Sequence, residues 1–167
     1  MVSSGTGQTC VGFTHNFEKE MVKFCAIEGG GTTWVCCIAV DSFENIGDSL
    51  SFETTKNPEE TLGAIKKWMK TQEFDAIGIA SFGPVDAKEG SATFGYITST
   101  PKKGWRNTDV VGLLGLRDEF KHIPFKFDTD VNAPAMAEFM LKNNAADRYN
   151  SNTAISIIRH SYLHHIS

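Results

Sequence analysis

Residues 26–34 read AIEGGGTTW and separate two apolar runs. The runs at 22–28 (VKFCAIE) and 33–40 (TWVCCIAV) are rich in strand-forming residues, and only the glycine-rich turn connects them. Because so short a connection leaves no room for a crossover helix, the two runs predict an antiparallel hairpin. The segment 46–53 is predicted to extend this hairpin into a meander.

Helical and strand-like segments alternate after the meander. Asn57 and Pro58 suit the cap and the first position of a helix, and apolar residues then recur at helical spacing: Leu62, Ile65, Trp68 and Met69. Further helices are expected at 110–120 and 132–143, a hairpin with an irregular loop at 88–107, and strands at 75–80, 124–128 and 153–158. This order predicts an α/β domain with helices packed on a mixed sheet.

The composition is that of one globular domain: 167 residues, 41% hydrophobic and 22% charged. A net charge of -4 favours neither nucleic acid nor an anionic membrane as a partner. No apolar run approaches the ~18 residues that span a bilayer. Residues 1–20 lack the features of a signal peptide and are expected to form a flexible extension.

Three of the four cysteines, Cys25, Cys36 and Cys37, lie within strand-like apolar runs, and none of the four forms a C-x-x-C pair. This pattern favours buried thiols in a reducing compartment, so we expect a cytoplasmic protein. Cys36 and Cys37 are neighbours and are expected to face opposite sides of their strand.

The glycine-rich turn has two interpretations. It contains neither the G-x-x-x-x-G-K-[ST] of a Walker loop nor the G-x-G-x-x-G of a dinucleotide site. Gly30 and Gly31 can still turn successive amides toward an anion, and Thr32 adds a hydroxyl. Glu28 would repel a phosphate unless a magnesium ion, held through water, lay between them. The alternative is a plain hairpin turn, which the glycines by themselves favour.

Carboxylates and two loops add to the candidate site. FDTDVNAP (127–134) places Asp130 where a strand ends and a helix begins, and a carboxylate there can act as a general base for a sugar hydroxyl. The alternative is that Asp130 or Asn132 caps the helix. SFGPVD (81–86) and TPKKGW (100–105) combine hydrogen-bonding groups with an aromatic face, as sugar-binding loops do, although each alone also reads as an ordinary surface loop.

Four stretches in order resemble the sugar kinases of the ROK family, and most closely its bacterial-type fructokinases. They are IEGGGTTWVC (27–36), AIGIASFGPVD (76–86), YITSTPKKGW (96–105) and FDTDVNAPAMAEF (127–139). The resemblance implies an actin-like ATPase (ribonuclease H-like) domain, the amino-terminal domain of a two-domain sugar kinase. It further implies phosphoryl transfer from ATP, with Mg²⁺, to the 6-hydroxyl of a hexose, most closely fructose.

The resemblance also implies residue roles. Asp130 matches the catalytic base, Glu28 the acidic residue near the metal, and Gly30, Gly31 and Thr32 the first phosphate-binding loop. The residues that match the surroundings of the sugar are Gly83, Pro84, Thr100, Pro101 and Asn132. Thr33 stands where the family usually has a lysine, which removes a cation near the phosphates.

The family pattern stops after residue 158. There the strand TAISII (153–158) would lead into a second glycine-rich phosphate loop, whereas residues 159–167 read RHSYLHHIS. We therefore expect a kinase domain at 21–158 and a non-family tail produced by truncation, through splicing, a frameshift or a gene-model error. None of the cysteines matches the family's zinc site, and His160 and His164 have too few neighbouring ligands for a metal site.

Two hypotheses follow from these patterns. The first is a fructokinase-type enzyme with little turnover by the truncated chain itself. The second is a catalytically inactive kinase fragment that acts only as a sugar-binding or dimerisation module. A missing second domain would leave an apolar face that favours association, so a homodimer is one expected assembly.

Overall fold

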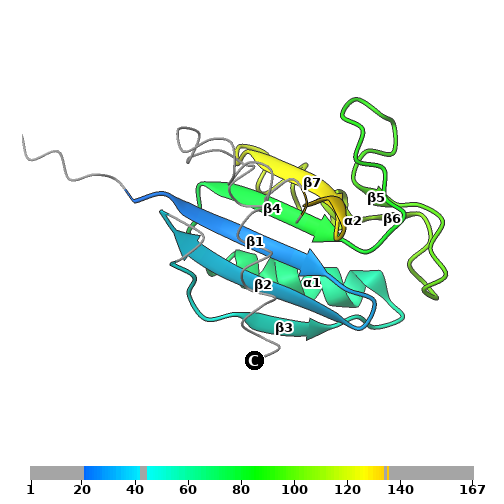
Figure 1. The fold of residues 1–167 in the computed structure, drawn as a ribbon, viewed down its shortest axis with the longest axis horizontal. Helices are drawn as coiled ribbons and strands as arrows, with labels where there is room; N and C mark the ends of the chain where they lie inside the picture. The colour runs from blue at the N-terminus through cyan, green and yellow to red at the C-terminus, as the bar shows by residue number, and fades with distance from the viewer. Residues whose placement is uncertain (1–20, 42–44, 134, 136–167) are drawn as a thin grey trace, which may run out of the picture.

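The computed structural model describes residues 21–41, 45–133 and 135, which form a five-stranded sheet with a helix on one face (Figure 1). The elements are β1 (Lys23–Gly29), β2 (Thr33–Val40), β3 (Leu50–Glu53), α1 (Pro58–Met69), β4 (Ala76–Ser81), β5 (Tyr96–Ile97), β6 (Thr108–Asp109), α2 (Val110–Leu113) and β7 (Phe125–Thr129). The strand order is β3-β2-β1-β4-β7. The first three strands pair antiparallel, and β1, β4 and β7 run parallel. The predicted hairpin, its meander and the mixed sheet are confirmed.

The two faces of the sheet carry different side chains. In β1, Cys25 and Ile27 face the larger core, while Phe24 and Ala26 face the opposite side. Adjacent residues of a strand point to opposite faces, so the buried run is divided between two cores. Cys36 and Cys37 are divided in the same way, and both are buried, as the sequence predicts.

Helix α1 covers the face with the larger core, as its capping signals and apolar spacing predict. The amide of Glu59 donates to Oδ1 of Asn57 at 3.1 Å, which satisfies one of the free amides of the first turn. Leu62, Ile65 and Met69 are fully buried against the sheet.

The helix predicted at 110–120 is wrong in length. Only α2 (Val110–Leu113) is helical, and Asp109 caps it by accepting from the amide of Gly112 at 2.8 Å. Gly115 then adopts a φ of +82°, a left-handed conformation that ends a helix, and the chain continues in turns. Leu114 and Leu116 are buried as expected. The apolar pattern therefore predicted correctly which side chains are buried, but not that the segment is helical.

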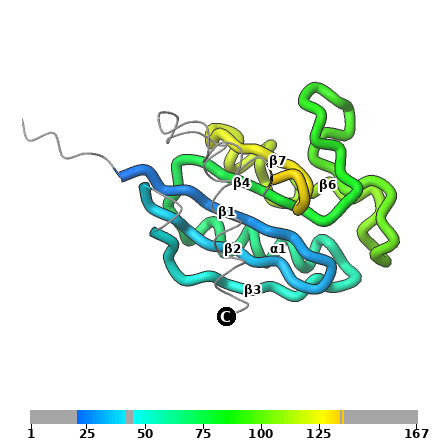
Figure 2. The backbone as a smooth tube through the Cα atoms, viewed as in Figure 1, coloured from blue at the N-terminus to red at the C-terminus, as the bar shows by residue number. Residues whose placement is uncertain are grey.

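After β4, the chain up to β6 builds loops beyond the carboxyl ends of the parallel strands, and the chain after α2 returns to the other end of the sheet, where β7 begins (Figure 2). The segment from β4 to β6 includes the short antiparallel β5–β6 pair, whose first strand lies within the hairpin predicted at 88–107 and whose second strand lies just beyond it. Asn132, Ala133 and Ala135 are helical. The rest of the helix predicted at 132–143, the strand at 153–158, the extension at 1–20 and the tail at 159–167 lie outside the described residues. Within the described part of the chain, the helices are too short and too polar to span a membrane.

Candidate functional site

The candidate site lies where the three parallel strands end. The amide of Phe82 donates to the carbonyl of Gly29 at 2.7 Å, which joins the end of β1 to the segment after β4. The amide of Asp130 donates to the carbonyl of Ser81 at 2.9 Å, which joins β4 to the segment after β7. In open α/β sheets this edge is where ligands bind.

Two carboxylates flank a small residue across this edge. Glu28 of β1 and Asp128 of β7 are both register partners of Ala80 in β4. Since neighbouring strands lie ~4.8 Å apart, the Cα atoms of the two acids are about 10 Å apart. The side chain of Ala80 is only a methyl group and belongs to the smaller core, on the sheet face opposite α1. Asp130 follows directly after β7 and adds a third acid.

Glu28 and Asp130 interact electrostatically. Burial raises the pKa of Glu28 and the nearby charge of Asp130 adds a smaller increase, so that together they bring it from 4.5 to about 7. Burial also raises the pKa of Asp130, although its own amide and that of Val131 oppose the effect by stabilising the carboxylate. The structure thus brings together the two acidic residues that the sequence placed in the site.

Oε2 of Glu28 is buried without a hydrogen-bond partner among the described residues. An unpaired buried carboxylate oxygen suits a cation or a water bound to one, so Glu28 fits the expected magnesium role. No cluster of three or more His, Cys, Asp or Glu side chains closes around a metal position in residues 21–41, 45–133 and 135. Waters and phosphate oxygens would therefore supply the other ligands, as is usual for Mg²⁺.

Thr129, and not Asp130, caps the helical residues that follow β7. Oγ1 of Thr129 accepts from the amide of Asn132 at 2.9 Å. The side-chain amide of Asn132 donates to Oδ1 of Asp128 at 3.1 Å, which fixes its orientation. Asp130 therefore does not cap through the Asn132 amide.

The hairpin turn is held by its carbonyl groups. The amide of Gly30 donates to the carbonyl of Thr33 at 2.9 Å. Thr54 donates to the turn twice, from Oγ1 to the Gly30 carbonyl at 2.8 Å and from its amide to the Thr32 carbonyl at 2.9 Å. Neither Gly30 nor Gly31 has a positive φ, so the turn does not use the left-handed angles that are open to glycine.

The first glycine of the turn has a packing role. A Cβ atom on Gly29 would lie 2.5 Å from Cη2 of Trp34, its register partner across the hairpin. Around Gly31, by contrast, there is open space. Thus the glycine closest to the strand admits an indole ring, and the glycine at the tip leaves backbone uncovered.

The two predicted sugar loops lie beside each other at this end of the sheet. The amide of Thr98 donates to the carbonyl of Pro84 at 2.8 Å, and a Cβ on Gly83 would lie 3.8 Å from Cγ2 of Thr129. Gly83 and Pro84 therefore lie between the end of β7 and the chain that leads to Thr100 and Pro101. Oγ1 of Thr100 accepts from the amide of Lys102 at 3.2 Å.

The aromatic residues of these loops are buried, so the expected aromatic face for a sugar is wrong. Trp105 is fully buried and Phe82 is 9% exposed. Trp105 stacks on Trp34 with ring centroids 5.7 Å apart, and its Nε1 donates to the carbonyl of Thr55 at 2.7 Å. The buried rings of Trp34, Phe82 and Trp105 hold the hairpin and the two loops together. The groups of these loops that remain for a ligand are backbone and polar groups.

One contact between the hairpin and a loop was not predicted from the sequence. Lys102, in the loop taken as sugar-binding, donates from Nζ to the carbonyl of Gly31 at the tip of the hairpin. Two lysines at 102–103, together with the absence of a lysine at position 33, were the available signal.

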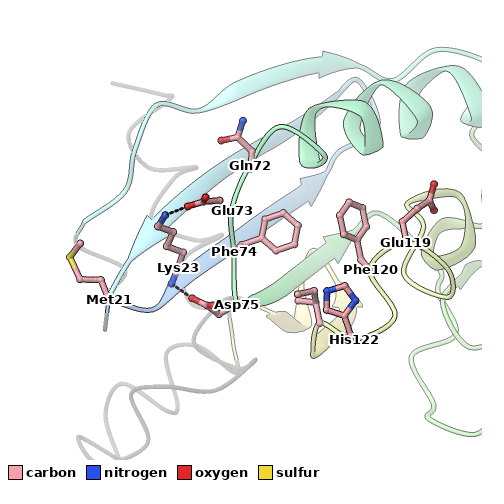
Figure 3. Close-up of a pocket in the computed structure, with 10 residues that line it drawn as sticks. Met21, Lys23, Gln72, Glu73, Phe74, Asp75, Glu119, Phe120 and His122 are labelled. Atoms are coloured by element: carbon pink, nitrogen blue, oxygen red, sulfur yellow. Dashed lines mark hydrogen bonds and ion pairs between the residues drawn. The ribbon is translucent and has the colours of Figure 1, made fainter. Parts of the chain in front are cut away.

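A separate hollow of about 520 Å³ lies at the opposite end of the sheet (Figure 3). Lys23 at the start of β1 pairs there with Glu73 at 2.7 Å, and the rings of Phe74 and Phe120 lie 5.5 Å apart. This hollow lies at the amino ends of β1 and β4, away from Glu28 and Asp130, and is distinct from the candidate site.

The sheet combines an antiparallel set, β3-β2-β1, with a parallel set, β1, β4 and β7, and acids stand at the carboxyl ends of β1 and β7. This is the fold that the resemblance to sugar kinases implies. Residues 24–157 match the model of the ROK family, and the chain belongs to that family.

The chain is 47% identical over 117 residues to a fructokinase of Lactococcus lactis subsp. cremoris, a match covering 70% of this chain and 39% of that protein. It is 44% identical over 121 residues to a fructokinase of Streptococcus mutans, covering 71% of this chain and 40% of that protein. A ROK family protein of Streptococcus pneumoniae, solved in complex with sucrose, superposes with a TM-score of 0.57 at 19% identity, over 73% of this chain and 39% of that one. The chain thus spans about two fifths of the length of these relatives.

Proposed function

We propose that this chain forms, over residues 21–158, the first domain of an ATP-dependent hexose kinase of fructokinase type. The observation that carries the proposal is the pairing of Glu28 and Asp130 at the carboxyl ends of β1 and β7, where burial raises the pKa of both. The likeness to proteins named fructokinase, at 41–47% identity, supports fructose as the substrate.

Asp130 is the proposed catalytic base. Its carboxylate would accept the proton of the sugar 6-hydroxyl as that oxygen bonds to the terminal phosphorus of ATP, while the bond from this phosphorus to the bridging oxygen breaks and ADP leaves. A raised pKa suits this role, because a stronger base accepts the proton more readily. The rest of catalysis is positioning and charge neutralisation, as in phosphoryl transfer generally.

The other proposed roles follow the edge of the sheet. Gly30, Gly31 and Thr32 bind phosphate through backbone amides and the threonine hydroxyl. Glu28 holds Mg²⁺ through water, and the ion when bound neutralises charge on the phosphates. Gly83, Pro84, Thr100, Pro101 and Asn132 surround the sugar with backbone and polar groups.

A second candidate function is binding without turnover, by a sugar-binding or dimerisation module. The observation that favours it is that the chain matches only 39% and 40% of the length of its two fructokinase relatives. An ATP site that closes between two domains needs groups from both domains. The buried thiols of Cys25 and Cys36 suit a reducing compartment, which supports the cytoplasm as the location of either.

A coupled assay of ADP release with fructose, glucose and mannose tests the proposal. We expect fructose to be preferred, and Asp130→Asn to lower kcat about 10²–10⁴-fold with a smaller effect on KM. Asp118→Asn removes an exposed acid and serves as the control. Turnover that survives Asp130→Asn would refute the assigned base, and fructose binding without turnover would support the binding module instead.

A further inference from the structure

We propose that Lys102 is the cation of the first phosphate-binding loop and that it binds phosphate groups together with the amides of Gly31 and Thr32. The inference rests on the proposed function and adds a residue to it. It makes TPKKGW (100–105) a loop that contributes to the phosphate site as well as to the sugar site.

The first observation is the contact between two motifs 71 residues apart. Nζ of Lys102 donates to the carbonyl of Gly31, so the ammonium lies at the tip of the hairpin. An ammonium has three protons to donate, and this bond uses one of them. The other two remain for an anion at the same place.

The second observation is that the lysine is held at its backbone. Its amide donates to Oγ1 of Thr100 at 3.2 Å, and its carbonyl accepts from the amide of Trp105 at 3.2 Å. Trp105 is itself fixed in the core. Gly104 between them has a φ of +87°, and a Cβ on it would lie 2.0 Å from the carbonyl oxygen of Lys56, so the loop is pressed against that segment.

The third observation is that one segment, 54–56, supports both partners. Thr54 donates to the carbonyls of Gly30 and Thr32 in the turn, while the carbonyl of Thr55 accepts from the Trp105 indole. The turn and the lysine loop are therefore both docked on the same three consecutive residues. This arrangement places Lys102 at the hairpin tip in the fold itself.

The fourth observation concerns the groups left at the tip. The carbonyls of Gly30, Gly31 and Thr32 are all engaged, by Thr54 or by Lys102. No residue in the described ranges accepts a hydrogen bond from the amide of Gly31 or Thr32. Donors that remain free beside an ammonium are complementary to a phosphate.

The sequence of the hairpin turn also favours a cation supplied from elsewhere in the chain. Thr33, where a lysine would add a second cation to the turn, is neutral. Nζ of Lys102 contacts the same turn at the Gly31 carbonyl, so the turn gains a cation that its own sequence does not supply.

Titration of the ¹⁵N-labelled full chain with inorganic tripolyphosphate, followed by NMR, tests the inference. We expect shifts at the amides of Gly31 and Thr32, and binding that Lys102→Met weakens about tenfold through loss of a charge-assisted hydrogen bond. Lys103→Met removes the same charge from the adjacent exposed position and should change the affinity less than about twofold. Lys102→Arg, which keeps the charge, should retain most of the binding.

Equal affinity of wild type and Lys102→Met, equal losses in both methionine variants, or no binding by wild type would each overturn the inference. A parallel titration with fructose separates it from the proposed function. The wild type could bind fructose and release ADP in its presence while Lys102→Met leaves tripolyphosphate binding unchanged. That result would reject the role of the lysine and leave the kinase proposal intact. If the wild type neither bound fructose nor released ADP in its presence, this would instead count against the kinase proposal.

Discussion

Glu28 should make the stability of the protein fall as the pH rises from about 5 to about 8. Its pKa in the folded chain is raised from 4.5 to about 7 by burial and by the charge of Asp130. In that pH window the folded state holds a proton that the unfolded state has lost, so the free energy of unfolding decreases with increasing pH. The stabilisation is present in full below the unfolded pKa and is lost above the folded one.

The magnitude follows from the size of the pKa change. At 1.36 kcal/mol for each pH unit, full burial would give an upper bound of about 3 kcal/mol. The carboxyl group keeps partial contact with water, which screens its charge, so we expect about 1–2 kcal/mol. Glu28→Gln has no proton to lose, and it should therefore be more stable than wild type at pH 8 by about this amount, with little difference at pH 5.

Urea unfolding of wild type and Glu28→Gln at both pH values, with EDTA to exclude metal, measures the effect. Glu60→Gln removes an exposed carboxylate in the first turn of α1 and should leave the pH profile of the wild type unchanged. If wild type and Glu28→Gln changed equally between the two pH values, the buried, unpaired carboxylate would not be the cause.

Three further outcomes are expected. Gly29→Ala should lower the free energy of unfolding in urea by about 1–3 kcal/mol, because its Cβ meets an indole ring, whereas Gly31→Ala, in open space, should stay within about 0.5 kcal/mol; equal effects would contradict the packing role. Trp105→Ala should cost about 3–5 kcal/mol in the same assay and lower the midpoint of thermal unfolding, and a loss below 1 kcal/mol would mean that the loop is not anchored by this ring. Cys25 and Cys36 should resist a thiol reagent until urea unfolds the chain, as mapped by mass spectrometry, since burial raises the pKa of both; rapid labelling of the native chain would refute this.

The sheet could be predicted because its signals are local. A three-residue glycine run between two apolar runs allows only a hairpin, and Asn57-Pro58 marks a helix start by hydrogen bonding and by a fixed φ. The helix predicted at 110–120 is too long, because the signal used for it was only the spacing of apolar residues. Apolar spacing reports which side chains are buried, but a buried turn that passes through Gly115 in a left-handed conformation shows the same spacing.

The acids of the candidate site could be located by motif, but their relation could not. That Ala80 lies in register between Glu28 and Asp128 depends on strand pairing, and no local pattern gives the register of parallel strands. The aromatic residues were misjudged for the same reason. Whether Trp105 faces a ligand or the core depends on Trp34, which lies 71 positions away in the chain and stacks on it.

This stacked pair gives the protein an optical probe of its own. The indoles of Trp34 and Trp105 lie 5.7 Å apart with an interplanar angle of 20°, close enough for their electronic transitions to couple. One is two residues from Thr32 and the other is three residues from Lys102, so any movement between turn and loop changes the geometry of the pair. Near-ultraviolet circular dichroism of the unlabelled chain should therefore report ligand binding at the hairpin, without an added fluorophore.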